Sequence, residues 1–197
     1  MEKIYETAYA KINLGLDVLG KRSDGYHEVR MVMQSVGLSD AVEIEEGEGL
    51  VVETDHSGLA GGPDNLAWKA AELLARCCGK IPNVHIRLNK KIFLAAGLAG
   101  GSSDAAAVMR GLSRLWQLDL TAPELEKLAA ELGSDIPFCI TGGTALAEGR
   151  GEILTELPEA PELLLVLAKP KLEVATGWVY GNFRQQKVNQ RPDIDGI

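Results

Sequence analysis

The segment LAAGLAGGSSDAAA, residues 94–107, has the composition of a loop that binds an anion. Three glycines fall within residues 97–101, and two serines and an alanine-rich stretch typical of a helix follow them. Glycine lets the backbone approach a phosphate closely, and the first N–H groups of a helix have no partner inside the helix and point toward an anion. Ser102 and Ser103 are expected to cap this helix or to donate to phosphate oxygens. The alternative is a glycine-rich turn that only allows close packing.

Other glycine and cysteine patterns exclude several kinds of site. The stretch from Gly15 to Lys21 nearly matches the P-loop pattern, but Arg22 takes the Ser/Thr position and no helix signal follows. The chain has no GxGxxG motif, so a Rossmann dinucleotide site is not supported. Three cysteines without a CxxC spacing argue against a zinc site or a disulfide framework. Reduced thiols and a cytoplasmic setting are therefore expected.

Composition describes an ordinary globular protein. The 197 residues include 20 Lys+Arg and 28 Asp+Glu, a net charge of −8, with 46% hydrophobic residues. This excludes wholesale disorder, and the acidic balance argues against sequence-independent binding of nucleic acid. No uninterrupted apolar stretch approaches the ~18 residues of a membrane helix, so no membrane association is expected.

The hydrophobic periodicity predicts strands and helices that do not alternate regularly, which favours an α+β fold. A hairpin is expected from residues 42–44 and 50–53. The other strands are predicted over residues 4–19, 84–88, 144–147, 152–157 and 162–168. Helices are predicted over residues 65–78 and 103–117, from Thr121 onward, and from near Thr176.

With the glycine loop in view, the chain resembles the GHMP kinase superfamily over nearly its whole length. The motifs occur in the order typical of that family, and the one at residues 19–28 is the most specific. The matching segments are residues 10–14, 19–28, 96–107, 133–138, 149–152, 169–170 and 176–180. The resemblance implies a GHMP kinase N-terminal domain of the ribosomal protein S5 domain 2-like type over residues 1–155. Residues 156–197 would begin a second α+β domain.

The resemblance also implies an activity, within a branch whose substrate carries a cytidine diphosphate group. The enzyme would transfer the γ-phosphate of ATP to the 2-hydroxyl of the methylerythritol part of that substrate, in non-mevalonate isoprenoid synthesis. Lys11 and Asp135 match the catalytic positions. A carboxylate can accept or orient the proton of the attacking hydroxyl, and a nearby ammonium keeps the carboxylate ionised and stabilises the transferring group. Taken alone, Lys11 suggests a surface lysine and Asp135 a helix cap.

The same resemblance assigns the binding residues. ATP, with Mg²⁺ bound to it, would contact Asn65, Leu94, Ala95, Ala96, Gly97, Leu98, Ala99, Gly100, Gly101, Ser102 and Ser103. The substrate would contact Asn13, Tyr26, His27 and Thr176. An aromatic ring beside a histidine suits a cytosine, through stacking and hydrogen bonds to the base edge. A ring packed on its own turn is the alternative for Tyr26, and a simple N-cap is the alternative for Asn65. No protein ligand of a metal is assigned.

Two features depart from the family pattern. Phe93 stands where the family usually has proline, which restores a backbone donor and frees φ. The family continues past Ile197 with a further glycine-rich motif, so the chain is expected to be a fragment with exposed apolar surface, and a homodimer is possible. A non-catalytic nucleotide-binding fragment is therefore one alternative function. A kinase for another small alcohol, homoserine or mevalonate, is a second, although the turn at residues 25–27 argues against it.

Overall fold

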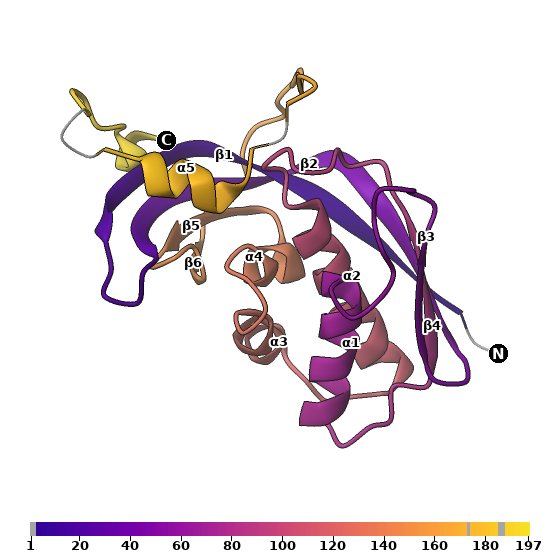
Figure 1. The fold of residues 1–197 in the computed structure, drawn as a ribbon. Helices are drawn as coiled ribbons and strands as arrows, with labels where there is room; N and C mark the ends of the chain where they lie inside the picture. Colours follow the sequence, from indigo (N-terminus) through magenta and orange to yellow (C-terminus); the bar gives the residue numbers. More distant parts are fainter. Residues whose placement is uncertain (1–2, 173, 185–187) are drawn as a thin grey trace.

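The fold is built on a long antiparallel pair of strands. In the computed structural model, which describes residues 3–172, 174–184 and 188–197, β1 (Lys3–Lys21) and β2 (His27–Glu46) form the curved ribbon that runs along the molecule in Figure 1. Their pairing shifts register three times, once between Tyr9 and Lys11. Such bulges bend a strand and re-aim its side chains, and they are common beside active sites.

Four shorter strands complete the sheet in the described part of the chain. The edge of β2 that faces away from β1 pairs with β4 (Val84–Asn89) along one part and with β5 (Thr144–Glu148) along another. Beyond them, β3 (Leu50–Thr54) runs parallel to β4, and β6 (Ile153–Glu156) runs antiparallel to β5. The order β3-β4-β2-β5-β6, with β1 on β2, gives a six-stranded sheet.

The expected hairpin between residues 42–44 and 50–53 is wrong, because β4 lies between β2 and β3. The short turn after β2 passes the start of β4, so β3 pairs with β4 and does not fold back onto β2. There the N–H of Gly47 donates to the carbonyl of Asn83 (3.1 Å) and the N–H of Val84 donates to the carbonyl of Gly49 (2.9 Å). Every second side chain of β4 is buried, which suits an inner strand.

Four helices cover one face of the sheet (Figure 1): α1 (Leu66–Cys77), α2 (Gly100–Leu115), α3 (Ala122–Ala129) and α4 (Ile136–Thr141). The helices expected in the first three places are confirmed, although α2 begins at the glycines rather than at residue 103. Its small buried side chains let the helix pack directly on the sheet, where a Cβ at Gly111 would lie 2.5 Å from Cδ1 of Ile44. The position of α2 is therefore fixed closely by packing.

The chain after β6 contains little regular structure. A helix, α5 (Thr176–Asn182), begins where one was expected, and a short 3-10 helix spans Ile194–Gly196. The strand expected over residues 162–168 is wrong, because within the described residues no strand lies beside them to pair with. The side chains of Leu164 and Val166 are 98% and 96% exposed.

Ion pairs hold the C-terminal residues to the β1–β2 ribbon, on the side of the molecule where α5 lies (Figure 1). The guanidinium of Arg191 donates to both oxygens of Asp17 on β1 (2.9 and 2.8 Å). The guanidinium of Arg30 on β2 donates to both oxygens of Asp195 (2.8 and 2.6 Å). Ile194, the residue before Asp195, is buried. No helix in the described part of the chain is long and apolar enough to cross a bilayer.

Candidate active site

The connection between β4 and α2 has an unusual backbone. Ala95, Gly97 and Ala99 have positive φ values of 50°, 72° and 58°. Alanine adopts this left-handed conformation only at a cost, so its surroundings must hold the loop in shape, and such strain is concentrated at functional sites. One such tie is the hydrogen bond from the backbone N–H of Lys11 to the carbonyl of Leu98 (3.1 Å). It brings the loop against β1 at the residue expected to be catalytic.

The start of α2 is open to an anion. Ala99 is the N-cap residue and contributes no capping side chain, so no side chain of the described chain caps the first-turn amides. Gly100 is needed for the close approach of this turn to the loop, because a Cβ there would lie 3.0 Å from Cγ2 of Ile92. The anion cradle expected from the glycines stays a prediction, and these uncapped amides are the groups that it would use.

Ser103 differs from its expected role. Its side chain is buried, and its hydroxyl donates to the carbonyls of Tyr9 (2.6 Å) and Ala99 (3.0 Å). The hydroxyl therefore neither caps α2 nor faces the cavity described below. It fastens the start of the helix to β1, because a buried hydroxyl must find an acceptor.

Lys11 and Asp135 face each other. The ammonium Nζ of Lys11 lies 3.5 Å from Oδ1 of Asp135 and donates to Oδ1 of Asn13 (3.2 Å). Lys11 is only 5% exposed, so it is not a surface lysine. Asp135 is the N-cap residue of α4, yet its carboxylate makes no capping hydrogen bond. The carboxylate is thus free to act on a ligand, and both simpler explanations from sequence fail.

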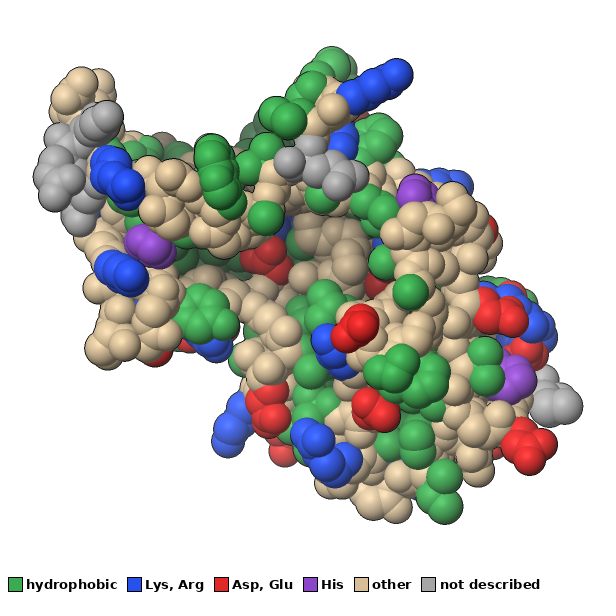
Figure 2. All heavy atoms as spheres, viewed as in Figure 1, with side chains coloured by type: hydrophobic (Ala, Val, Ile, Leu, Met, Phe, Trp, Pro, Cys, Tyr) green, Lys and Arg blue, Asp and Glu red, His purple; other side chains and the backbone are tan. Residues whose placement is uncertain are grey.

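A cavity of about 720 Å³ contains this pair. It opens between the α5 end of the molecule and the helices, where the surface is hollowed in Figure 2. It brings together eight of the predicted site residues, from β1, the turn after it, the start of β2, the glycine loop, and the starts of α2, α4 and α5. They are Lys11, Asn13, Tyr26, His27, Gly97, Ser102, Asp135 and Thr176.

Aromatic rings line one end of the cavity. The rings of His27 and Tyr180 stack with centroids 5.2 Å apart, and the guanidinium of Arg150 lies 4.7 Å from the centre of the Tyr26 ring. Burial raises the pKa of the Tyr180 hydroxyl, and the carboxylate of Asp135 adds to the rise. Stacked rings with a guanidinium beside them are suited to binding a planar base.

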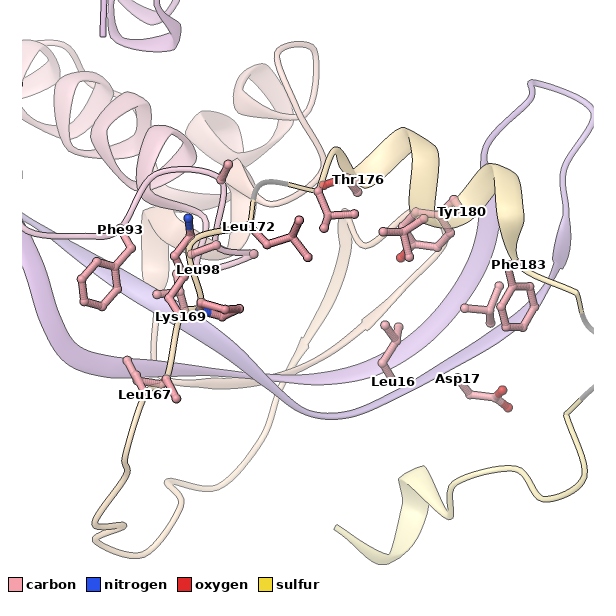
Figure 3. A pocket seen from close by; sticks show the side chains of 18 of the residues that line it. Leu16, Asp17, Phe93, Leu98, Leu167, Lys169, Leu172, Thr176, Tyr180 and Phe183 are labelled. Carbon is pink, nitrogen blue, oxygen red and sulfur yellow. The ribbon is translucent and has the colours of Figure 1, made fainter. Parts of the chain in front are cut away.

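Tyr180 and Arg150 were missed as site residues, although both lie in motifs that the sequence singled out. Thr176 and Tyr180 are four residues apart in α5, so they share one face of that helix, and Figure 3 shows both projecting from it. The four-residue spacing from Thr176 is therefore a sequence signal for Tyr180. Nothing in the sequence alone indicates that Arg150 lies over Tyr26.

A second, mostly apolar cavity of about 750 Å³ lies on the other side of the loop. Gly97, Thr176 and Tyr180 line both cavities. In Figure 3, Phe93 and Leu98 come to it from the loop and Leu172 from the segment before α5. Phe93 is half exposed at this cavity. A phenylalanine in the usual proline position is thus accommodated while the loop keeps its contact with β1.

Asn65 and Leu94 line neither of these cavities. Oδ1 of Asn65 accepts the N–H of Ala67 (2.9 Å), and its amide nitrogen donates to the carbonyl of Ala60 (2.8 Å). These are the contacts of an N-cap, the simpler of the two explanations for Asn65.

The sheet with helices on one face, the glycine loop and the Lys–Asp pair beside it are the features of a GHMP-type small-molecule kinase. The sequence model of the family "GHMP kinases N terminal domain" matches residues 65–143. This confirms the α+β class and the superfamily that the motifs indicated.

The similar proteins are more specific. The chain is 48% identical over 196 residues to the 4-diphosphocytidyl-2-C-methyl-D-erythritol kinase of Acetivibrio thermocellus, covering 99% of the chain and 69% of that protein. It is 51% identical over 187 residues to the enzyme of the same name from Synechococcus sp. (strain JA-3-3Ab), covering 94% of the chain and 60% of the relative. A crystal structure of a 4-(cytidine 5'-diphospho)-2C-methyl-D-erythritol kinase superposes with a TM-score of 0.79 at 35% identity, covering 98% of this chain and 69% of that one.

The chain belongs to the 4-diphosphocytidyl-2-C-methyl-D-erythritol kinase family. It spans 60% to 69% of the length of these relatives.

Proposed function

We propose that this chain binds ATP and a cytidine diphosphate-linked methylerythritol and presents the 2-hydroxyl of that substrate to the γ-phosphate. The observation that carries the proposal is one cavity lined by both Gly97 of the glycine loop and the Lys11–Asp135 pair. Phosphoryl transfer needs mainly positioning and electrostatic stabilisation, so these groups can suffice for it.

In the proposed reaction the carboxylate of Asp135 orients the acceptor hydroxyl and accepts its proton as that oxygen attacks the γ-phosphorus. The new O–P bond forms while the bond from the γ-phosphorus to the β–γ bridging oxygen breaks, and ADP leaves. The ammonium of Lys11, 3.5 Å from that carboxylate, stabilises the negative charge that builds on the transferring group. The first-turn amides of α2 bind phosphate oxygens of the nucleotide. Asn13 holds the lysine by accepting its hydrogen bond.

The cytidine diphosphate part is proposed to lie at the aromatic end of the cavity. Tyr26, His27 and Tyr180 supply ring faces for the base. The cations Lys21 and Arg150 line the same cavity and suit a diphosphate. This end of the cavity makes a cytidine-bearing substrate a better fit than a small uncharged alcohol.

Magnesium is proposed to arrive with the nucleotide. The described residues contain no cluster of three or more His, Cys, Asp or Glu side chains that could hold a metal ion. The hydroxyl of Ser102 and the carboxylate of Asp135 line the cavity and are the oxygen ligands that magnesium prefers. Bound there, the ion would offset charge on the phosphates, and most of its ligands would come from the nucleotide and water.

A division of the chain into residues 1–155 and 156–197 is part of the proposal. The sheet ends at Glu156 with β6. Among the described residues after it, Ile194 is the only buried hydrophobic one. The second part therefore contributes α5 to the site but little to the core.

The test is binding and transfer with the 197-residue chain. Calorimetry measures the affinity for Mg²⁺–ATP and for the cytidine-linked substrate, and ³¹P NMR follows transfer of the phosphoryl group. Replacing Asp135 with Asn should lower the transfer rate by roughly 10²–10⁴-fold. The affinity for Mg²⁺–ATP should change much less than the rate, because most ligands of the ion would come from the nucleotide and water. Asp119→Asn, an exposed carboxylate in the loop before α3, is the matched control.

Three outcomes would contradict the proposal. If Asp135→Asn transfers the phosphoryl group at nearly the unsubstituted rate, Asp135 does not take part in the reaction. Binding of both ligands without transfer by the unsubstituted chain would favour a non-catalytic nucleotide-binding role. Displacement of the cytidine-linked substrate by homoserine or mevalonate at similar concentrations would favour a kinase that acts on one of these small alcohols.

A further inference from the structure

Three charged side chains lie together in the interior, outside both cavities. They are Asp40 on β2, Lys90 just after β4, and Asp104 in the second turn of α2. The ammonium of Lys90 pairs with both carboxylates, and the three side chains are between 0% and 2% exposed. Burying charges is expensive, and two acids sharing one base leave an excess negative charge, so simple packing does not explain this triad.

The triad joins the two ends of the glycine loop. At the start of the loop, Oδ1 of Asp40 accepts the backbone N–H groups of Lys91 and Ile92, the latter at 2.8 Å. At its end, Lys90 holds Asp104 in α2, and Nζ of Lys90 lies 3.7 Å from where a Cβ of Gly100 would be. A single ammonium thus links the segment that enters the loop to the helix that leaves it.

The loop between these anchors needs such support. Ala95 and Ala99 have positive φ, a conformation that is unfavourable for alanine unless the surrounding structure stabilises it. Phe93, at the start of the loop, lacks the ring constraint of proline. The loop therefore carries little rigidity of its own, and its shape depends on what fixes its two ends.

The surroundings of Asp104 disfavour a charge on its carboxyl. Its Oδ1 is buried and finds no hydrogen-bond partner within the described structure. Burial raises the pKa of Asp104 to about 7 against the pull of Lys90, and Asp40 adds to the rise. Below about pH 7, a proton on this carboxyl removes the excess charge and leaves one ion pair, Lys90 with Asp40.

We infer that Asp40, Lys90 and Asp104 are positioning residues that hold the glycine loop in the conformation that presents its amides to the nucleotide. The three side chains act through the backbone of residues 90–104. The nucleotide part of this inference rests on the proposed function. The anchoring of the loop does not, so the two can be tested separately.

Two variants separate a local role from a role in the whole fold. Lys90→Met removes the shared ammonium and leaves two carboxylates facing each other, which can prevent folding. The double variant Lys90→Met/Asp104→Leu replaces the buried pair with apolar side chains, a change that proteins often tolerate, and still cuts the link between loop and helix. Lys91→Met is the matched control, because it is the same change at the next residue, where the side chain is exposed.

The measurement is hydrogen–deuterium exchange of peptides covering residues 92–104 without nucleotide, followed by calorimetric titration with Mg²⁺–ATP at pH 7.5. In the double variant, exchange in this segment should rise about tenfold and ATP affinity should fall about tenfold, equivalent to about 1.4 kcal/mol. Peptides from α3 should exchange as before. Lys91→Met should change neither readout by more than about twofold.

Unchanged exchange over residues 92–104 in the folded double variant would overturn the inference. So would failure of that variant to fold, because the triad would then serve the fold as a whole. If the unsubstituted chain does not bind ATP, the proposed function fails, and the exchange result still decides whether the triad anchors the loop.

Discussion

Asp104 is expected to make the stability of this chain depend on pH. Its pKa is about 7 in the folded chain, against 3.8 for an ordinary aspartate, and the charged groups that face it are Lys90 and Asp40. Between these values the unfolded chain loses the proton while the folded chain keeps it, so the unfolding free energy falls as pH rises. The fall can reach about 1.4 kcal/mol per pH unit and stops above pH 7.

The measurement is the difference in unfolding free energy between the unsubstituted chain and Asp104→Asn, from urea titrations between pH 4.5 and pH 8.5. As pH rises to about 7, the unfolding free energy of the unsubstituted chain should fall relative to that of Asp104→Asn. Above about pH 7 the difference should stay constant. Asp119→Asn, at a carboxylate exposed in solvent, is the control. A flat difference for Asp104→Asn would show that this carboxyl is ionised throughout.

At the same scale, sequence identified residue types but not their surroundings. Lys11 and Asp135 were chosen through the family pattern, and only the fold shows that one is buried and the other lacks a capping bond. Ser103 looked like a ligand residue because a serine at a helix start usually caps or donates. Its hydroxyl turns to Tyr9 instead, since α2 begins three residues earlier than its hydrophobic pattern suggested.

At the scale of elements, Gly100 determines how closely α2 approaches the loop. A Cβ at this position would lie 3.0 Å from Cγ2 and 3.3 Å from Cβ of Ile92, which is only 2% exposed. Gly100→Ala should therefore push the helix start away from the loop. We expect a loss of about 1–3 kcal/mol of stability and weaker binding of ATP.

Thermal unfolding and calorimetric titration with Mg²⁺–ATP check this expectation. Gly37→Ala is the matched control, because an added Cβ meets nothing within 4 Å there and the glycine is exposed on β2. If Gly100→Ala binds ATP as tightly as the unsubstituted chain, close packing of the loop on α2 is not what shapes the anion site.

The elements that sequence predicted well are those whose own residues carry the periodicity. β1, α1, β4 and α2 show clear alternation or helical spacing, and each forms within a few residues of its expected place. Pairing order is different, because it depends on contacts distant along the chain. The turn after β2 gives no sign that β4, more than thirty residues later, will lie between β2 and β3.

At the scale of the whole molecule, the chain presents an apolar ridge at residues 163–167. An alternating or continuous apolar run predicts a strand only if a partner strand exists, and the described structure provides none here. Leu164 and Val166 are 98% and 96% exposed, and exposed apolar clusters of this kind drive association. The 197-residue chain should therefore self-associate as its concentration rises.

Sedimentation velocity over a wide concentration range checks this, with Leu164→Glu/Val166→Lys as the test variant. The paired charges should shift the chain toward monomer while leaving the unfolding free energy within about 0.5 kcal/mol, because neither side chain packs on the core. Ile81→Glu is the control, since Ile81 is 76% exposed and is not one of the residues of the ridge. If Ile81→Glu lowers association as much, or if the unsubstituted chain sediments as a monomer throughout, the ridge is not an association surface.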